Sequence, residues 1–225
     1  MSTFTTAIHR AHRFLAMHSF YPLVLASLLA CGLLAGRIYL TRTHHFIFLI
    51  WNLFLAWIPY MWSMWAAAID RRYPGAWWRL ILPGSIWLIF FPNAPYIITD
   101  LIHLQWAPQQ TLLYDAGMVA AFAWSGCFLG VASLRAWQNI VERYAGWSAG
   151  WIFAILMVGL GGLGVYIGRF LRWNSWDLLL NPGVLLADVL ERAAHIRAAG
   201  MTAIFAALLL VCYLMFTLSR QRVDL

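Results

Sequence analysis

Long apolar runs make up most of the chain, and short polar stretches separate them. Six of these runs have about the length that an α-helix needs to cross a bilayer. They cover residues 20–36, 46–69, 80–98, 112–134, 148–168 and 201–218. Tryptophans such as Trp77, Trp106, Trp147 and Trp173 lie near the ends of these runs, where the amphipathic indole ring prefers the headgroup region. The pattern predicts an all-α membrane bundle of about six transmembrane helices.

One further apolar pattern, over residues 184–199, differs from the six runs. It carries Asp188, Glu191, Arg192 and Arg197, which are too many charges for a span that faces lipid. Its apolar residues recur on one helical face, so we expect an amphipathic helix in the membrane interface, with a re-entrant segment as the alternative.

The chain shows no internal repeat and no linker, which predicts a single integral membrane domain over residues 1–225. Within it we expect an N-terminal segment over 1–19, the helix bundle over 20–218 and a short tail over 219–225. The first apolar run continues past Cys31, so we expect this span to remain uncleaved.

Composition excludes several classes of protein. Hydrophobic residues make up 63% of the chain and charged residues 10%, whereas a soluble domain carries about 25% charged residues. A soluble enzyme, a coiled coil, a disordered chain and a disulfide scaffold are therefore excluded. The three cysteines lie singly within apolar runs, a pattern that favours neither a disulfide framework nor a thiolate metal site.

The net charge of +7 comes from 15 basic and 8 acidic residues. The basic residues are all arginines, and they occur singly or in pairs between the apolar runs, which argues for membrane topology rather than nucleic-acid binding. If both termini are cytoplasmic, nine arginines lie inside and six lie outside. The positive-inside rule therefore predicts cytoplasmic termini.

The stretch FFPNAPYIITDLIHL, residues 90–104, carries candidate chemistry. Two prolines, Pro92 and Pro95, remove backbone donors, so the third helix should kink or break there. Polar residues then follow at intervals of three and four, as Asn93, Tyr96, Asp100 and His103. An Asp and a His at this spacing can relay a proton, orient one another or ligate a metal. The alternative is a packed proline kink in which both residues merely mark the water boundary.

A second stretch, GLGGLGVYIGRFLRWNSWD, covers residues 159–177. Gly164 and Gly168 have the GxxxG spacing that permits close approach of two helices. Arg169 and Arg172 fall on one helical face and have the chemistry to clamp a phosphate or carboxylate. Alternatively, the arginines extend to the lipid headgroups or pair with Asp177.

The predicted topology brings the polar ends of several spans to the outer side, which suggests an outward-opening polar cavity capped by residues 184–199. Its candidate ligand-binding residues are Asn52, Asn93, Tyr96, Tyr166, Arg169, Arg172, Asn174 and Asp177. The candidate catalytic residues are Asp100, His103 and Asp115. A metal site is only weakly indicated, at His44, His45 and His103, because their spacing fits no metal motif. We therefore expect no metal and no cofactor.

Both stretches, together with Trp51-Asn52-Leu53, resemble the bacterial membrane-protein family labelled domain of unknown function 1361. The resemblance covers roughly residues 45–218. It implies a multi-pass protein of the bacterial inner membrane and adds no substrate, cofactor or catalytic residue.

Three hypotheses for function follow from the residues. In the first, the cavity binds or transports an anionic or polar envelope molecule, such as a lipid headgroup, that Arg169 and Arg172 contact. The second is a membrane-embedded hydrolase or transferase acting on a lipid or envelope substrate, and the third is a structural or assembly protein. The bilayer is the expected partner, nucleic acid is not, and the sequence predicts no oligomeric state.

Overall fold

The computed structural model describes residues 2–193 and 196–221, and every regular element among them is helical. The first half contains α1 (Ser2–Met17), α2 (Phe20–Thr41), α3 (Phe48–Arg72), η1 (Trp77–Leu80), α4 (Ile81–Phe90), α5 (Asn93–Tyr96) and η2 (Ile97–Trp106). The second half contains α6 (Leu112–Ala145), α7 (Trp147–Tyr166), η3 (Ile167–Leu171), α8 (Asp177–Leu180), α9 (Pro182–Ala193) and α10 (Ile196–Gln221). The predicted all-α class is confirmed.

Five helical stretches in the described part of the chain are long and apolar enough to cross a membrane. They are Phe20–Thr41, Trp77–Trp106, Leu112–Ala145, Trp147–Leu171 and Ala198–Leu218. The remaining predicted span, 46–69, forms the 25-residue helix α3, which packs against α4 and α6 and exposes side chains such as Trp51 and Phe54 on its other side. It is not among the five stretches: tryptophan, tyrosine and asparagine residues interrupt its apolar sequence, and its last turn is charged.

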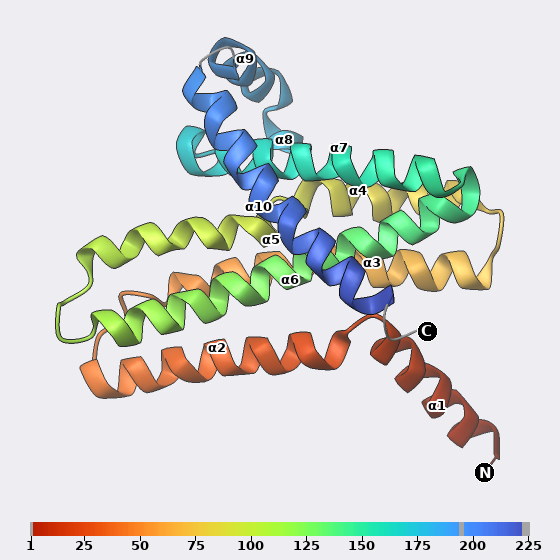
Figure 1. Cartoon of the computed structure of the whole chain (residues 1–225), viewed down its shortest axis with the longest axis horizontal. Coiled ribbons are helices and arrows are strands. Elements are labelled where there is room, and N and C mark those ends of the chain that lie inside the picture. Colours follow the sequence, from red (N-terminus) through yellow and green to blue (C-terminus); the bar gives the residue numbers. More distant parts are fainter. Residues whose placement is uncertain (1, 194–195, 222–225) are drawn as a thin grey trace.

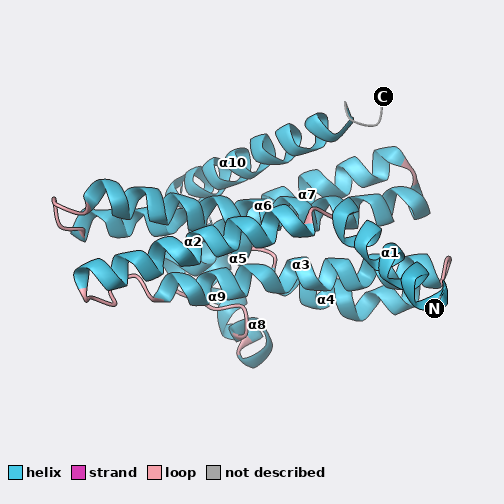
Figure 2. Cartoon of the chain, turned by 90° about the horizontal axis from the view of Figure 1, so that it is seen from below, coloured by secondary structure: helices cyan, strands magenta, loops and turns pink. Residues whose placement is uncertain are grey.

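Helix α6 is the centre of the bundle. In an 18-residue apolar stretch of α6, 72% of the residues are buried, against 17–33% in the corresponding stretches of the other four spans. It contacts α2, α3, α5, α7, α10 and η2, and Figures 1 and 2 show these elements around it. The outer helices accordingly expose large apolar side chains such as Leu25, Phe54 and Leu156, as expected of surfaces that face lipid.

The third predicted span breaks where the prolines predict. Helix α4 ends at Phe90, a turn follows at Phe91 and Pro92, and the chain continues as the one-turn helix α5. It does not end at residue 98, because the 3₁₀ helix η2 carries it on to Trp106. Figure 1 shows η2 and the start of α6 side by side, and the two elements are in contact.

The predicted close approach at the glycines is also present. A Cβ atom on Gly164 would lie 2.4 Å from Pro92 Cγ, and one on Gly168 would lie 3.2 Å from Tyr96 Cε2. The GxxxG pair thus faces Pro92 and Tyr96, which have the same spacing on the broken helix. On another side of α7, a Cβ atom on Gly162 would lie 2.5 Å from the carbonyl oxygen of Thr202 in α10.

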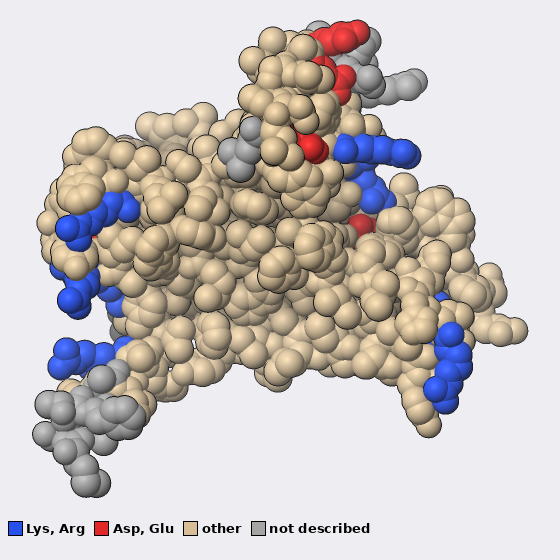
Figure 3. All heavy atoms as spheres, turned by 180° about the vertical axis from the view of Figure 1, so that it is seen from behind, with Lys and Arg blue, Asp and Glu red and all other residues tan. Residues whose placement is uncertain are grey.

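The two ends of the bundle are formed by different segments of the chain. One end, which we call the proximal end, holds α1 and the last turns of α10 (Figure 1). The opposite, distal end holds residues 42–47 and 107–111, which connect neighbouring helices. On the face in Figure 3, basic atoms lie at both ends, further basic and acidic atoms lie on and just below the part that projects at the top, and the rest of the surface between the ends is uncharged. This arrangement is that of a bundle that crosses a membrane; the cytoplasmic position of the proximal end stays a prediction.

The predicted amphipathic segment 184–199 is divided in the structure. Helix α9 ends at Ala193 and α10 begins at Ile196, while residues 194–195 lie outside the described residues. Figures 1 and 2 show α8 and α9 projecting from one side of the bundle. Within α9, Val184 and Leu190 are exposed, as an interfacial helix requires.

Candidate functional site

Two irregular helical segments meet near the distal end and carry the charged residues of the site. The 3₁₀ helix η2 runs for ten residues, although 3₁₀ runs beyond three or four residues are uncommon. Its three residues per turn place Asp100 and His103 on one face. Opposite it, Arg169 lies on η3, a five-residue π-helical segment. Such segments are rare overall, and those that occur often lie at functional sites.

The side chains of Asp100, His103 and Arg169 form what we call the charged cluster. The Asp100 side chain is 1% exposed, and its Oδ1 lies 3.6 Å from Arg169 Nη1 and 3.9 Å from His103 Nε2. Arg169 Nη2 also lies 3.3 Å from His103 Nε2. A carboxylate buried in a membrane protein requires such a partner, because an unpaired charge is costly there.

Two uncharged side chains hold the cluster in place. Asn52, on α3, donates from Nδ2 to Asp100 Oδ2 over 2.7 Å. Arg169 Nη1 lies 3.5 Å from the Tyr96 hydroxyl. The cluster therefore joins α3, the broken third span and the end of α7 through polar contacts.

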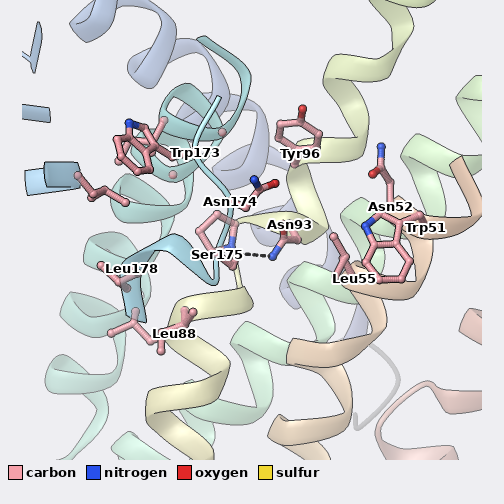
Figure 4. Close-up of a pocket in the computed structure, with 16 residues that line it drawn as sticks. Trp51, Asn52, Leu55, Leu88, Asn93, Tyr96, Trp173, Asn174, Ser175 and Leu178 are labelled. Atoms are coloured by element: carbon pink, nitrogen blue, oxygen red, sulfur yellow. Dashed lines mark hydrogen bonds between the residues drawn. The ribbon is translucent and has the colours of Figure 1, made fainter. Parts of the chain in front are cut away.

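A cavity of about 250 Å³ lies beside the charged cluster. Its walls come from α3, the α4–α5 break, the end of α7 and the segment from Trp173 to Leu185. Figure 4 shows Tyr96, Asn52 and Asn174 in the upper part of the view, with Asn93 and Leu55 at mid-height. Leu178 and Leu88 lie lower in the same view. We call this space the amide cavity, because its polar end is built largely from asparagine side chains.

The charged cluster does not line the amide cavity. Of the described residues that do, none carries a charge. Asn52 and Tyr96 belong to both groups: each lines the cavity, and each also contacts the cluster, Asn52 at Asp100 and Tyr96 at Arg169. The charges thus lie behind an uncharged wall. Asp100 accepts a hydrogen bond from Asn52, and Arg169 donates one to the Tyr96 hydroxyl.

The segment after α7 closes one side of the amide cavity. Asn93 Nδ2 donates to Ser175 Oγ over 2.7 Å, the dashed line in Figure 4. Trp173 Nε1 donates to Asp188 Oδ2 over 2.8 Å, which ties the segment to α9. Ser175 was not among the predicted site residues, although it lies in the motif that contains them.

Three other predicted ligand-binding residues lie outside the cavity wall. Asp177 Oδ2 accepts a hydrogen bond from the backbone N–H of Asn174 over 2.7 Å, so it stabilises a local turn. Tyr166 stacks on Phe170 with ring centroids 5.3 Å apart. Arg172 is exposed and ends η3 in the left-handed region, with φ 61°.

Asp115, the third predicted catalytic residue, belongs to a separate group. It forms a buried two-point ion pair with Arg37, through Nε to Oδ1 at 2.9 Å and Nη2 to Oδ2 at 3.2 Å. Thr111 Oγ1 donates to the same carboxylate over 3.0 Å, and the Arg37 guanidinium also reaches Thr41 and Thr43. Arg37 was not predicted as a partner. The available signal was its position between the apolar run 20–36 and the apolar residues Ile38, Tyr39 and Leu40, where a charge must find a counter-ion.

No three histidine, cysteine, aspartate or glutamate side chains in the described part of the chain come together as a metal-ligand group. Of the histidines, His45 packs against Phe46 with ring centroids 5.0 Å apart, and His103 packs against Phe48 at 4.7 Å. The geometry of the site is therefore that of an uncharged cavity beside a paired acid, base and arginine.

Comparison with known proteins gives one match. The family model described as "Protein of unknown function (DUF1361)" matches residues 51–212, a range that contains the amide cavity and the charged cluster. No curated protein and no solved structure matches the chain.

Proposed function

The chain belongs to the family DUF1361, whose function is unknown, and from the site itself we propose that it binds the polar head of a membrane amphiphile. The observation that carries this proposal is the division of the amide cavity into a polar end and a leucine end. Ligand sites commonly combine an apolar lining with a few placed polar groups that fix orientation.

The leucine end supports a ligand that arrives from the bilayer. Leu88 is 45% exposed and Leu178 is 42% exposed, so the cavity rim there belongs to the outer surface of the bundle. Leu88 lies within the membrane-crossing stretch Trp77–Trp106, where that surface would face acyl chains. An amphiphile can place its head among the amides while its chains remain in lipid.

The charged cluster acts in this proposal by positioning the wall. Asp100 accepts one N–H of Asn52, which leaves the amide oxygen and the second N–H of Asn52 for a ligand. Arg169 stands beside the Tyr96 hydroxyl oxygen as a donor, so the hydroxyl proton of Tyr96 can be donated elsewhere. A rigid, preorganised wall lowers the entropic cost of binding.

The test compares wild-type protein with Ser175→Phe in nanodiscs of total bacterial lipid, read by native mass spectrometry. Ser175 lines the cavity, so a phenyl ring there should fill it and abolish lipid adducts that survive on the wild type. Ser148→Phe is the matched control, because Ser148 is exposed at the start of α7, far from the cavity in sequence. Equal adducts on Ser175→Phe and wild type would refute the proposal.

The proximity of Asp100 and His103 supports a second candidate, a membrane-embedded hydrolase or transferase. His103 is 27% exposed, so its imidazole is open to a substrate while the buried Asp100 can orient it. The test is turnover by reconstituted protein on a panel of lipid and envelope substrates. Activity lost in both Asp100→Asn and His103→Gln would support this candidate, and an inactive wild type on the whole panel would count against it.

A further inference from the structure

We propose that the head bound in the amide cavity is an uncharged polyhydroxyl group of sugar type, so that the ligand is a glycosylated lipid. This inference rests on the binding function proposed above and adds the chemical class of the head. It differs from the expectation of an anionic head contacted by Arg169 and Arg172, and it follows from which residues line the cavity.

The described wall of the amide cavity carries no charged side chain. The polar side chains that line the cavity are those of Asn52, Asn93, Tyr96, Asn174 and Ser175. A phosphate offers only acceptor oxygens and a negative charge, which arginine and lysine match best. The guanidinium of the charged cluster, Arg169, faces the Asp100 carboxylate at 3.6 Å, so its charge is offset.

The wall still offers both donors and acceptors after its internal hydrogen bonds are counted. Asn93 donates to the Phe90 carbonyl oxygen and to Ser175 Oγ and so presents its acceptor oxygen, whereas Asn52 keeps its oxygen and one N–H. The hydroxyls of Tyr96 and Ser175 accept from Arg169 and Asn93 and can still donate. A ligand that satisfies all of them must also donate and accept at adjacent positions. Neighbouring hydroxyl groups on a sugar ring meet this requirement, whereas an acceptor-only phosphate would give the amide oxygens no donor.

Two indole rings flank the asparagines of the cavity. Figure 4 shows Trp173 and Trp51 on opposite sides of Asn174 and Asn93. The hydrogen bond from Trp173 Nε1 to Asp188 fixes that ring, and Trp51 is 54% exposed. Flat aromatic faces suit the C–H faces of a sugar ring, because they add apolar contact without a competing charge.

Size agrees with a single head rather than a whole lipid. The cavity of about 250 Å³ lies just below the range of about 300–1,000 Å³ for pockets that enclose drug-sized ligands. It can hold a ring-sized head, and the exposed rim at Leu88 and Leu178 leaves the acyl chains outside in the bilayer.

The experiment offers nanodisc-embedded protein three lipids with identical acyl chains: a glucosyl diacylglycerol, phosphatidylglycerol and plain diacylglycerol. Native mass spectrometry reads the bound fraction of each. We expect the glucosyl lipid to be retained at least ten-fold better than the other two. Asn174→Leu should weaken its binding by about three- to ten-fold, the effect of one lost hydrogen bond.

Two controls make the outcomes decisive. Asn174 is exposed, so its substitution spares the fold, and thermal unfolding in detergent checks this. Asn139→Leu is the matched control, because Asn139 is exposed on α6 and is not among the cavity-lining residues.

Each result has one meaning. The sugar inference would be overturned if the protein preferred phosphatidylglycerol or bound all three lipids equally. The binding function would stand in either case, provided that Ser175→Phe blocks the binding. Adducts that Ser175→Phe leaves unchanged for every lipid would overturn the binding function and the inference with it. Preferred retention of the glucosyl lipid that Asn174→Leu weakens and Asn139→Leu does not would support the inference.

Discussion

The buried ion pair between Arg37 and Asp115 gives the sharpest test of how the distal end is held together. The two side chains are 4% and 0% exposed, and they meet through two hydrogen bonds. Arg37→Met keeps a long side chain and removes the charge. It leaves the Asp115 carboxylate with the Thr111 hydroxyl as a donor, and breaking a buried pair in this way costs about 3–5 kcal/mol.

The assay is unfolding in mixed dodecyl maltoside and sodium dodecyl sulfate micelles, followed by far-ultraviolet circular dichroism. Arg37→Met and Asp115→Leu should each lose about 3–5 kcal/mol of unfolding free energy. The double variant should recover most of that loss, because replacing a whole buried pair by apolar side chains is often neutral. Such a cycle isolates the interaction between the two residues.

Arg169→Met provides the comparison, because it removes a charge from the charged cluster instead. Arg169 is 18% exposed and lies 3.6 Å from Asp100, which keeps its hydrogen bond from Asn52. We expect a smaller loss, about 1–3 kcal/mol, together with weaker binding in the amide cavity. The reasoning is refuted if Arg37→Met costs less than about 1 kcal/mol, or if the double variant is as unstable as the two single losses together.

Three further predictions concern packing, topology and the segment after α7. Gly164→Leu should destabilise the bundle by about 1–3 kcal/mol through overpacking. Gly159→Leu should not, because nothing lies within 4 Å of the position that its Cβ would take. Unfolding in mixed micelles measures both variants. Reporter fusions after residues 105 and 175 should both report the non-cytoplasmic side, and a cytoplasmic signal at either would contradict the predicted orientation. Trp173→Phe removes the indole donor to a carboxylate on α9 and should speed hydrogen exchange in α9 at least several-fold; unchanged exchange would show that this bond does not hold the segment.

Local chemistry explains which features could be predicted from the sequence. Pro92 and Pro95 lack backbone donors wherever they lie, so the break after Phe90 followed from residue type alone. Gly164 has no side chain, and its spacing from Gly168 was enough to predict close packing of α7. The placement of Asp100 and His103 on one face held because a 3₁₀ helix aligns residues three apart even better than an α-helix does.

Side-chain pairing between distant helices could not be predicted in the same way. Arg37 and Asp115 are 78 residues apart, and their contact depends on how two helices are rotated about their axes. In the same way, the direction in which η3 presents Arg169 decides that its guanidinium faces Asp100 instead of the cavity. Ser175 lines the cavity because the chain turns back after η3, and neither the turn nor the π-helical segment has a signature in the sequence.

The unequal lengths of α6 and α7 leave a step at one side of the bundle, next to the site. At about 1.5 Å per residue, the 34 residues of α6 extend about 51 Å and the 20 residues of α7 about 30 Å. The two helices share the turn at Gly146, so α7 stops about 20 Å before its neighbour does. The chain fills this step with η3 and the segment that follows it. An amphiphile bound in the amide cavity would therefore place its head beside the end of the shorter helix, where η3 and the segment after it form the wall.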